Sequence, residues 1–287
     1  MKGWKKKVLG LFLAVILTAM GAVPGAAAHP QVINVMTTYP EGWTLHYPDG
    51  HTSKGGYFHV RETGERLFCL EPQINPVMST RDHWVTLTQY FGDAAFAKKL
   101  SLTAWYGENS GWGLNGWAAA QSLIWKYIMQ RNGTAGEQWI STDTLTSREK
   151  LQPYYDAIEQ KVAAYNKLPS FDRQTITLQA GQSTELTDTN GALSDMKVES
   201  SGPIQVSKDG NKLTITASGT DGGTGTVSLK KQLSGGREGE NFVYTAEEYQ
   251  DLMTCGEYAP VRASLTVDVT DAPVSMVFSK QDVTTGQ

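Results

Sequence analysis

Between residues 116 and 131 the chain reads Gly-Trp-Ala-Ala-Ala-Gln-Ser-Leu-Ile-Trp-Lys-Tyr-Ile-Met-Gln-Arg, and the rest of the N-terminal region can be interpreted around this stretch. Trp117, Gln121, Ile124, Trp125 and Ile128 recur at the spacing of one helix face, with about 3.6 residues per turn. The spacing predicts a helix over residues 116–131 with that face buried. Gln121 lies on the buried face, where a primary amide is unexpected.

The buried amide admits two interpretations. A buried amide without partners costs about 1–3 kcal/mol, so Gln121 must either hydrogen-bond to other groups or be chemically altered. Most buried polar groups find partners, which by itself favours a core glutamine with satisfied hydrogen bonds. The residues around position 121 leave both interpretations open.

Residues 1–28 have the features of a secretory signal peptide. Four lysines near the N-terminus precede an apolar run from Val8 to Val23, and small residues follow up to Ala28. We therefore predict cleavage after Ala28 and secretion of the remaining chain.

The charge of the chain excludes one class of partner. The sequence has 25 Lys and Arg against 29 Asp and Glu, and the first 28 residues hold four lysines and no acid. The 259 residues after the predicted cleavage site therefore carry a net charge of −8. An acidic chain without a Lys/Arg cluster repels phosphate, so we expect no nucleic-acid partner. No later apolar run is long enough to span a membrane, so we expect no span in the mature chain.

A change of composition near residue 170 predicts two domains. Residues 29–170 contain all five histidines and several short strand patterns, followed by predicted helices at 94–106, 116–131 and 149–167. A capping box at 146–149 should begin the last helix. This pattern predicts an α+β domain. Residues 171–272 alternate Thr, Ser and Val, with a hairpin predicted at Asp209-Gly210, and indicate an antiparallel β-sandwich.

The two cysteines are the other candidates for chemistry. Cys69 follows the strand pattern Leu67-Phe68 in the first domain, and Cys255 lies in the second. A free cysteine is usually inert packing, whereas two cysteines in a secreted chain favour a disulfide by default. A Cys69–Cys255 bridge would join the two predicted domains.

The motifs in order resemble the thioester domains of Gram-positive surface adhesins. Tyr57-Phe58-His59-Val60 leads into Phe68-Cys69-Leu70-Glu71, and Ala120-Gln121-Ser122-Leu123-Ile124-Trp125 follows about fifty residues later. The family's second motif has threonine and a small residue where this chain has Ala120 and Leu123. These two differences affect local packing and leave the reacting atoms in place.

The resemblance implies an internal thioester between the Cys69 sulfur and the Gln121 side chain, formed without a separate enzyme. It implies an adhesin that reacts once with an amine, such as a lysine of a host protein, and not a turnover enzyme. Trp117, Ile124 and Trp125 would support a dry pocket around the bond. No cofactor is implied, and we expect a monomer at the cell surface or cell wall.

The tail from Val277 to Gly286 resembles the start of a Cna-B or prealbumin-like pilin repeat. Residues 273–287 would then be the truncated beginning of that repeat. Lys280 would be the lysine that forms an intramolecular isopeptide bond with a downstream asparagine.

Three alternatives compete with the thioester. A cysteine hydrolase or transglutaminase-like enzyme would need a histidine well downstream of Cys69, and only His83 follows, fourteen residues later. A metal site is unsupported, because the spacings of His46, His51 and His59 match no common zinc pattern. A non-covalent adhesive protein with Cys69 free or bridged to Cys255 shares every other feature.

Overall fold

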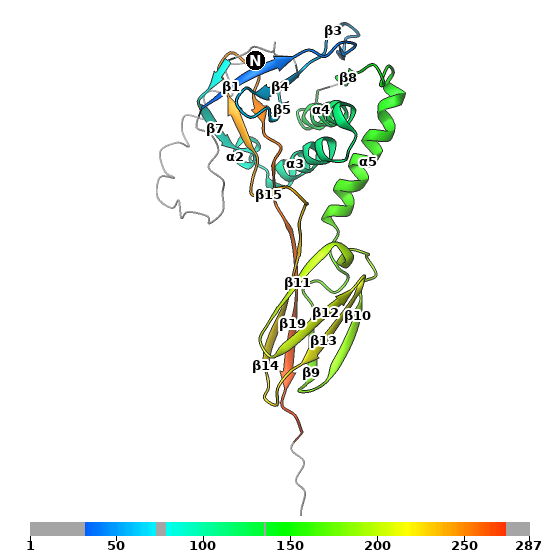
Figure 1. Ribbon diagram of the computed structural model, residues 1–287, viewed down its shortest axis with the longest axis vertical. Helices are drawn as coiled ribbons and strands as arrows, with labels where there is room; N and C mark the ends of the chain where they lie inside the picture. The colour runs from blue at the N-terminus through cyan, green and yellow to red at the C-terminus, as the bar shows by residue number, and fades with distance from the viewer. Residues whose placement is uncertain (1–31, 73–78, 135, 274–287) are drawn as a thin grey trace, which may run out of the picture. The chain divides into compact units, whose positions relative to one another are not determined.

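The computed structural model describes residues 32–72, 79–134 and 136–273, which fall in a single compact unit (Figure 1). The predicted signal peptide, its cleavage site after Ala28 and the tail with Lys280 lie outside the described residues. Within the described ranges, none of the helices is both long and apolar enough to cross a membrane.

The N-terminal region is built on a seven-stranded sheet in which every neighbouring pair is antiparallel. Its order is β6 (Ser79–Arg81), β1 (Ile33–Thr38), β4 (Tyr57–Val60), β5 (Arg66–Cys69), β17 (Leu252–Met253), β16 (Phe242–Thr245) and β7 (His83–Thr86). A separate three-stranded sheet joins β3 (Thr52–Lys54), β2 (Thr44–His46) and β8 (Trp139–Ser141). The short strand patterns of the sequence, at residues 32–36, 43–47, 57–61 and 67–70, correspond to β1, β2, β4 and β5; the other strands of these two sheets were not predicted.

Strands β16 and β17 correct the predicted division of the chain. The sequence analysis assigned their residues to the sandwich at 171–272, but the structure pairs β17 with β5 and β16 with β7 (orange in Figure 1). Val243, Leu252 and Met253 are fully buried there. Alternation of apolar residues predicts a strand without saying which sheet receives it, so the apolar core beside β5 determines the outcome.

Four helices follow β7: α2 (Leu87–Phe91), α3 (Ala94–Asn109), α4 (Gly113–Arg131) and α5 (Arg148–Asn166). Asp93 begins α3 by accepting a hydrogen bond from the Phe96 N–H at 3.0 Å. The predicted capping box of α5 is absent, because Ser147 stands at the N-cap without a side-chain hydrogen bond. The three predicted helix ranges are otherwise matched to within a few residues.

Helices α3 and α4 pack closely because glycine lies at their contact. A Cβ atom on Gly107 would lie 2.2 Å from the Ala120 Cβ, and one on Gly116 would lie 2.4 Å from the Gly107 carbonyl oxygen. Neither position has room for a side chain. This close contact fixes the position of α4 against α3, and with it the positions of the residues that follow Ala120.

Residues 175–231 and 261–270 form two further sheets, which we call the two-sheet region. One sheet has the order β10 (Ser183–Thr187), β13 (Lys212–Ala217), β12 (Ile204–Asp209), and the other β11 (Met196–Ser201), β14 (Gly223–Lys231), β19 (Val261–Thr270), β9 (Thr175–Gln179). Buried residues of both sheets share one hydrophobic core. Strands β12 and β13 form the hairpin predicted at Asp209-Gly210. The antiparallel prediction is wrong for β19 and β9, which pair in parallel.

Between β14 and β19 the chain leaves the two-sheet region and returns to it. Residues 232–260 contain β15 (Arg237–Glu238) and β18 (Glu257–Tyr258), which pair in parallel, as well as β16 and β17. Lys231 and Val261, at the two ends of this excursion, are register partners. Residues 232–260, which we call the excursion, therefore leave and rejoin the second sheet at the same register pair.

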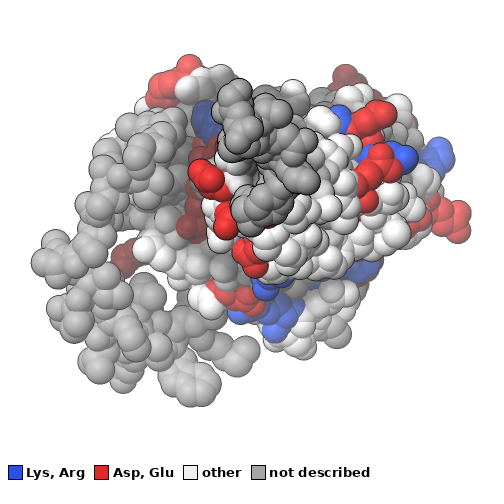
Figure 2. All heavy atoms as spheres, turned by 90° about the horizontal axis from the view of Figure 1, so that it is seen from below, with Lys and Arg blue, Asp and Glu red and all other residues white. Residues whose placement is uncertain are grey.

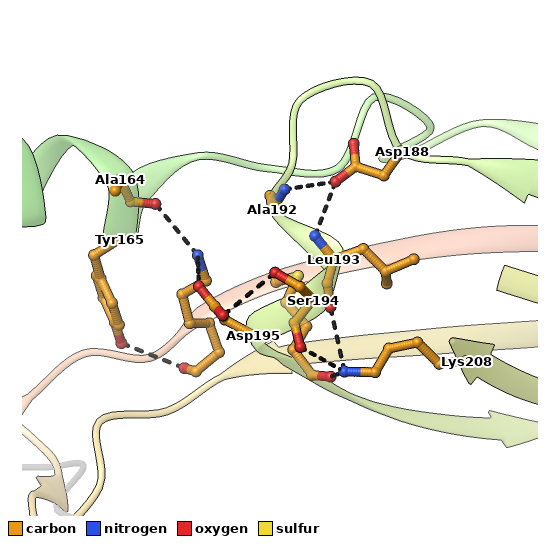
Figure 3. A network of polar contacts seen from close by, with 10 residues as sticks. Ala164, Tyr165, Asp188, Ala192, Leu193, Ser194, Asp195 and Lys208 are labelled. Atoms are coloured by element: carbon orange, nitrogen blue, oxygen red, sulfur yellow. Dashed lines mark hydrogen bonds and ion pairs between the residues drawn. The ribbon is translucent and has the colours of Figure 1, made fainter. Parts of the chain in front are cut away.

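A buried lysine joins the end of α5 to the two-sheet region. Lys231 is 5% exposed, and its Nζ donates to the Ala164 carbonyl at 3.2 Å and lies 3.7 Å from Asp195 Oδ2. The Tyr165 hydroxyl donates to the Lys231 carbonyl at 3.3 Å. Figure 3 shows Ala164 and Tyr165 beside Asp195. A cation near the last carbonyls of a helix is favoured by the helix dipole.

A buried carboxylate organises the neighbouring loop, which ends in a short helical turn, η1 (Leu193–Asp195). Asp188 accepts hydrogen bonds from the backbone N–H groups of Ser170, Asn190, Ala192 and Leu193. Figure 3 shows the last two. Burial acts to raise the pKa of Asp188, but these donors outweigh it and hold the pKa below its usual range.

The charged surface agrees with the acidic composition. On the face shown in Figure 2, Lys and Arg side chains lie beside Asp and Glu side chains and form no continuous basic patch among the described residues. This face offers no electrostatic footprint for a phosphate backbone.

Candidate functional site

Cys69 is the last residue of β5, in the middle of the seven-stranded sheet. Leu252 of β17 is its register partner, and the Leu70 N–H donates to the Asp251 carbonyl at 2.9 Å. On the other side, β4 pairs with β5 only as far as Leu67. The backbone of Cys69 therefore extends past the end of β4 and needs another partner there.

The side chain of Gln121 supplies that partner. The Cys69 N–H donates to Gln121 Oε1 at 2.8 Å, and Gln121 Nε2 donates to the Cys69 carbonyl at 2.9 Å. The carboxamide thus takes the place of a peptide group of a neighbouring strand. Gln121 is fully buried and Cys69 is 1% exposed, so both hydrogen bonds are shielded from water. The structure brings together the two residues that the sequence singled out.

Burial keeps the Cys69 thiol protonated. It raises the pKa of Cys69 to about 12. The Glu71 backbone and the Trp125 indole act in the opposite direction, but their effects are smaller. The carboxylates of Glu71 and Asp251 add a smaller upward effect, because a second negative charge nearby is unfavourable. The sulfur also lies 3.4 Å from the Glu71 carbonyl oxygen, to which the thiol donates. The thiolate form is strongly disfavoured in this site.

The three residues predicted to support the pocket are all buried in the same core. Trp117 stacks on Phe68, the residue before Cys69, with ring centroids 5.3 Å apart. Ile124 is fully buried and Trp125 is 5% exposed. The Trp125 indole acts to lower the pKa of the Cys69 thiol. An apolar, aromatic wall therefore surrounds the Cys69–Gln121 pair.

The excursion contributes residues that sequence reasoning did not place at this site. Asp251 donates its N–H to Glu71 Oε2 at 3.1 Å and accepts from the Tyr90 hydroxyl at 2.8 Å. Gln250 Nε2 donates to the Glu71 carbonyl at 3.3 Å. No local pattern in the run Gln250-Asp251-Leu252 indicates that it pairs beside Cys69.

Comparison with known proteins yields one structural likeness. No family model matches the chain, and no curated protein matches it. A solved structure, the thioester domain of the Staphylococcus aureus TIE protein, is similar with a TM-score of 0.62 and 21% identity. The match covers 83% of this chain and 97% of that one. The chain has a thioester-domain fold. At this level of identity the likeness establishes the fold alone.

Cys255 lies apart from the pair within the thioester-domain fold. Its sulfur donates to the Arg66 carbonyl at 3.7 Å, three residues before Cys69 along β5. Both cysteines are free and buried, and burial raises the pKa of Cys255 well above its ordinary value. The structure contains no bridge between Cys69 and Cys255.

Among the described residues, no histidine hydrogen-bonds to Cys69. His46 stacks on Trp139 and hydrogen-bonds to Ser141 at 2.9 Å, while His51 pairs with Asp49 on the surface. His83 is exposed beside Asp82. In the described part of the chain, no cluster of three or more His, Cys, Asp or Glu side chains could hold a metal ion. The hydrogen bonds of Cys69 in this structure involve Gln121 and Glu71.

Proposed function

We propose that this chain is a surface adhesin whose Cys69 and Gln121 form an internal thioester, through which it attaches covalently to an amine-bearing ligand. The observation that carries the proposal is the paired hydrogen bond between the Gln121 carboxamide and the Cys69 backbone. The thioester-domain fold supports it, as does the contact between the strand that carries Cys69 and the helix that carries Gln121.

Formation of the bond needs no outside reagent. The Cys69 sulfur attacks the side-chain carbonyl carbon of Gln121, a C–S bond forms, and the C–N bond breaks. The thiol proton goes to the departing nitrogen, which leaves as ammonia. Holding the two groups together in this way can lower the barrier by about 7–11 kcal/mol. The Cys69 N–H, 2.8 Å from Gln121 Oε1, is in place to stabilise the negative charge that develops on that oxygen.

The second step is transfer to an amine. The amine nitrogen attacks the thioester carbonyl, the C–S bond breaks, and an amide joins residue 121 to the ligand while Cys69 recovers its proton. Water could replace the amine and leave a carboxylate at position 121. The buried aromatic wall of Trp117, Ile124 and Trp125 limits that loss by excluding water. The chain reacts once, so it is not a turnover enzyme, and the step needs no cofactor.

The partner and location of the adhesin are part of the same proposal. A lysine on a host protein supplies a primary amine of the required chemistry. The signal sequence directs the chain out of the cell, and the tail with Lys280 would begin an isopeptide-linked repeat that extends it from the surface. These assignments use sequence features outside the described residues.

The intact mass of the purified chain, residues 29–287, prepared without reductant or amine buffer, tests the thioester. We expect a deficit equal to one ammonia, and addition of methylamine at residue 121. Cys69→Ala and Gln121→Ala should abolish both. Cys255→Ala is the matched control, because it removes the other buried thiol and should keep both.

Two other masses would contradict the proposal, and a third would show that the thioester formed and was then lost. A deficit of two hydrogens means a Cys69–Cys255 disulfide. A full mass with an unmodified amide at residue 121 means a free thiol and a non-covalent adhesin. Replacement of one ammonia by one water marks a thioester that formed and then hydrolysed, and peptide mapping locates the resulting carboxylate.

A further inference from the structure

The indole N–H of Trp125 is an unusual group for a protein core. Its Nε1 is buried and makes no hydrogen bond of ordinary geometry with any of the described residues. Buried donors are nearly always paired, because leaving one unpaired costs about as much as a lost hydrogen bond. The unpaired state of this donor is explained if the indole N–H gains its acceptor only during the reaction of the chain.

The position of Trp125 in α4 directs it toward the reacting pair. It follows Gln121 by four residues, so the two side chains lie on the same face, one turn apart. Long side chains in a helix lean toward its N-terminus, which places the indole over the turn that carries Gln121. The indole lowers the pKa of the Cys69 thiol, consistent with an N–H beside the sulfur.

We propose that the Trp125 indole donates a hydrogen bond to the Cys69 sulfur when the thioester is opened, and so controls how fast the chain reacts with amines. This inference rests on the proposed function. The amine nitrogen bonds to the Gln121 carbonyl carbon, and the C–S electron pair moves to sulfur. The proton lost by the amine ends on that sulfur. The indole N–H bond is not broken; it stabilises the charge on sulfur before the proton arrives.

The environment of Cys69 makes such a donor necessary. Burial and the carboxylates of Glu71 and Asp251 all oppose negative charge on the sulfur. A leaving group that cannot carry charge departs slowly, which protects the thioester from water but also slows the amine. A hydrogen bond to a charged sulfur is stronger than one to a neutral thioester, so the indole favours the transition state over the ground state.

Trp105 of α3 provides a control tryptophan that the proposed pocket does not include. It is 7% exposed, and its ring lies near that of Tyr258, with ring centroids 6.0 Å apart. Trp105 is not among the groups that shift the pKa of the Cys69 thiol. Replacing either Trp125 or Trp105 by phenylalanine removes one indole N–H and a similar volume from the protein interior. The two variants therefore differ mainly in whether the lost N–H acts on the Cys69 sulfur.

The experiment compares the rate of methylamine addition in the wild-type chain, Trp125→Phe and Trp105→Phe, each first shown by intact mass to carry the ammonia deficit. We expect Trp125→Phe to react about tenfold more slowly, because it loses one hydrogen bond to a charged group. Trp105→Phe should react at the wild-type rate. Equal rates for all three chains, or equal slowing in both variants, would overturn the inference and leave the thioester intact.

Nuclear magnetic resonance of the wild-type chain gives a second readout that does not depend on the variants forming the bond. With nitrogen-15 tryptophan, the indole N–H resonance of Trp125, assigned by its loss in Trp125→Phe, should shift when methylamine opens the thioester. The Trp105 resonance should stay in place. A stationary Trp125 resonance refutes the inference, whereas a wild-type chain without the ammonia deficit refutes the proposed function itself.

Discussion

Replacing Gln121 by glutamate should make the stability of the folded chain depend on pH in a predictable way. The comparison is best made between Cys69→Ala and Cys69→Ala/Gln121→Glu, because neither chain can form a thioester and both keep the residue-69 backbone. In the structure, Nε2 of the carboxamide donates to the Cys69 carbonyl at 2.9 Å. An ionised carboxylate would instead set oxygen against oxygen in a fully buried site, so the carboxyl group must retain a proton to remain folded.

The magnitude follows from the cost of keeping that proton. An unfolded glutamate has a pKa of about 4.3, and each pH unit above it costs about 1.36 kcal/mol for a group held protonated. At pH 7 the double variant should therefore be about 3.7 kcal/mol less stable than Cys69→Ala. The sign is that of a carboxyl group with a raised folded pKa. Below about pH 4.3 the double variant has its full free energy of unfolding, and this free energy falls as the pH rises toward the folded pKa of the carboxyl group introduced at residue 121.

Urea unfolding of both variants at several pH values from 4 to 8 measures this difference in free energy. Near pH 4 the protonated carboxyl can donate to the Cys69 carbonyl as the amide did, and the two chains should be nearly equal. A difference that stays constant over this range would refute the reasoning, because it would show that residue 121 has access to water. The result also bears on the proposed function, since hydrolysis of the proposed thioester would leave the same carboxylate at residue 121.

Three further predictions concern the surroundings of the site. The Gln121→Ala variant leaves the Cys69 thiol free. Its free energy of unfolding should fall as the pH rises from about 8.5, where an unfolded thiol ionises, toward the folded pKa of about 12. Adding Cys69→Ala should remove that part of the decline. Gly107→Ala should cost about 1–3 kcal/mol by forcing α3 away from α4, and thermal unfolding together with a smaller ammonia deficit would show it. Asp188→Ala should cost about 2–4 kcal/mol by removing the acceptor of four N–H groups, and because the Asp188 pKa is lowered, the wild-type advantage should disappear in acid as the pH falls below about 3.9.

Sequence reasoning succeeded at the site where the information is local. The burial of Gln121 was predicted because a helix repeats every 3.6 residues or so, and its apolar positions can be counted within one stretch. The strand that ends at Cys69 was likewise visible in a short run of apolar residues. That these two segments meet was implied only by the resemblance, because nothing in either stretch specifies the pairing. The structure shows the reason, which is the early end of β4 beside β5.

The failures have a common physical origin. Residues 242–253 fell within the predicted sandwich, but the sheet that a strand joins depends on contacts far away in the sequence. The role of Glu71 could not be inferred either, because its neighbours Gln250 and Asp251 come from the excursion. The capping box failed for a smaller reason: the motif at 146–149 was present, but α5 begins at Arg148 and its N-cap Ser147 makes no side-chain hydrogen bond.

The excursion also explains why the cysteine site depends on the two-sheet region. The excursion leaves at Lys231 and returns at Val261, which are register partners in β14 and β19. Between these points, Leu252 must lie opposite Cys69. A one-residue slip in a sheet turns every side chain to the opposite face, so the register of β14 and β19 limits where Leu252 can pair. The position of Cys69 relative to Gln121 is therefore specified from both sides: by helix α4 on one, and on the other by strands that belong to a separate core.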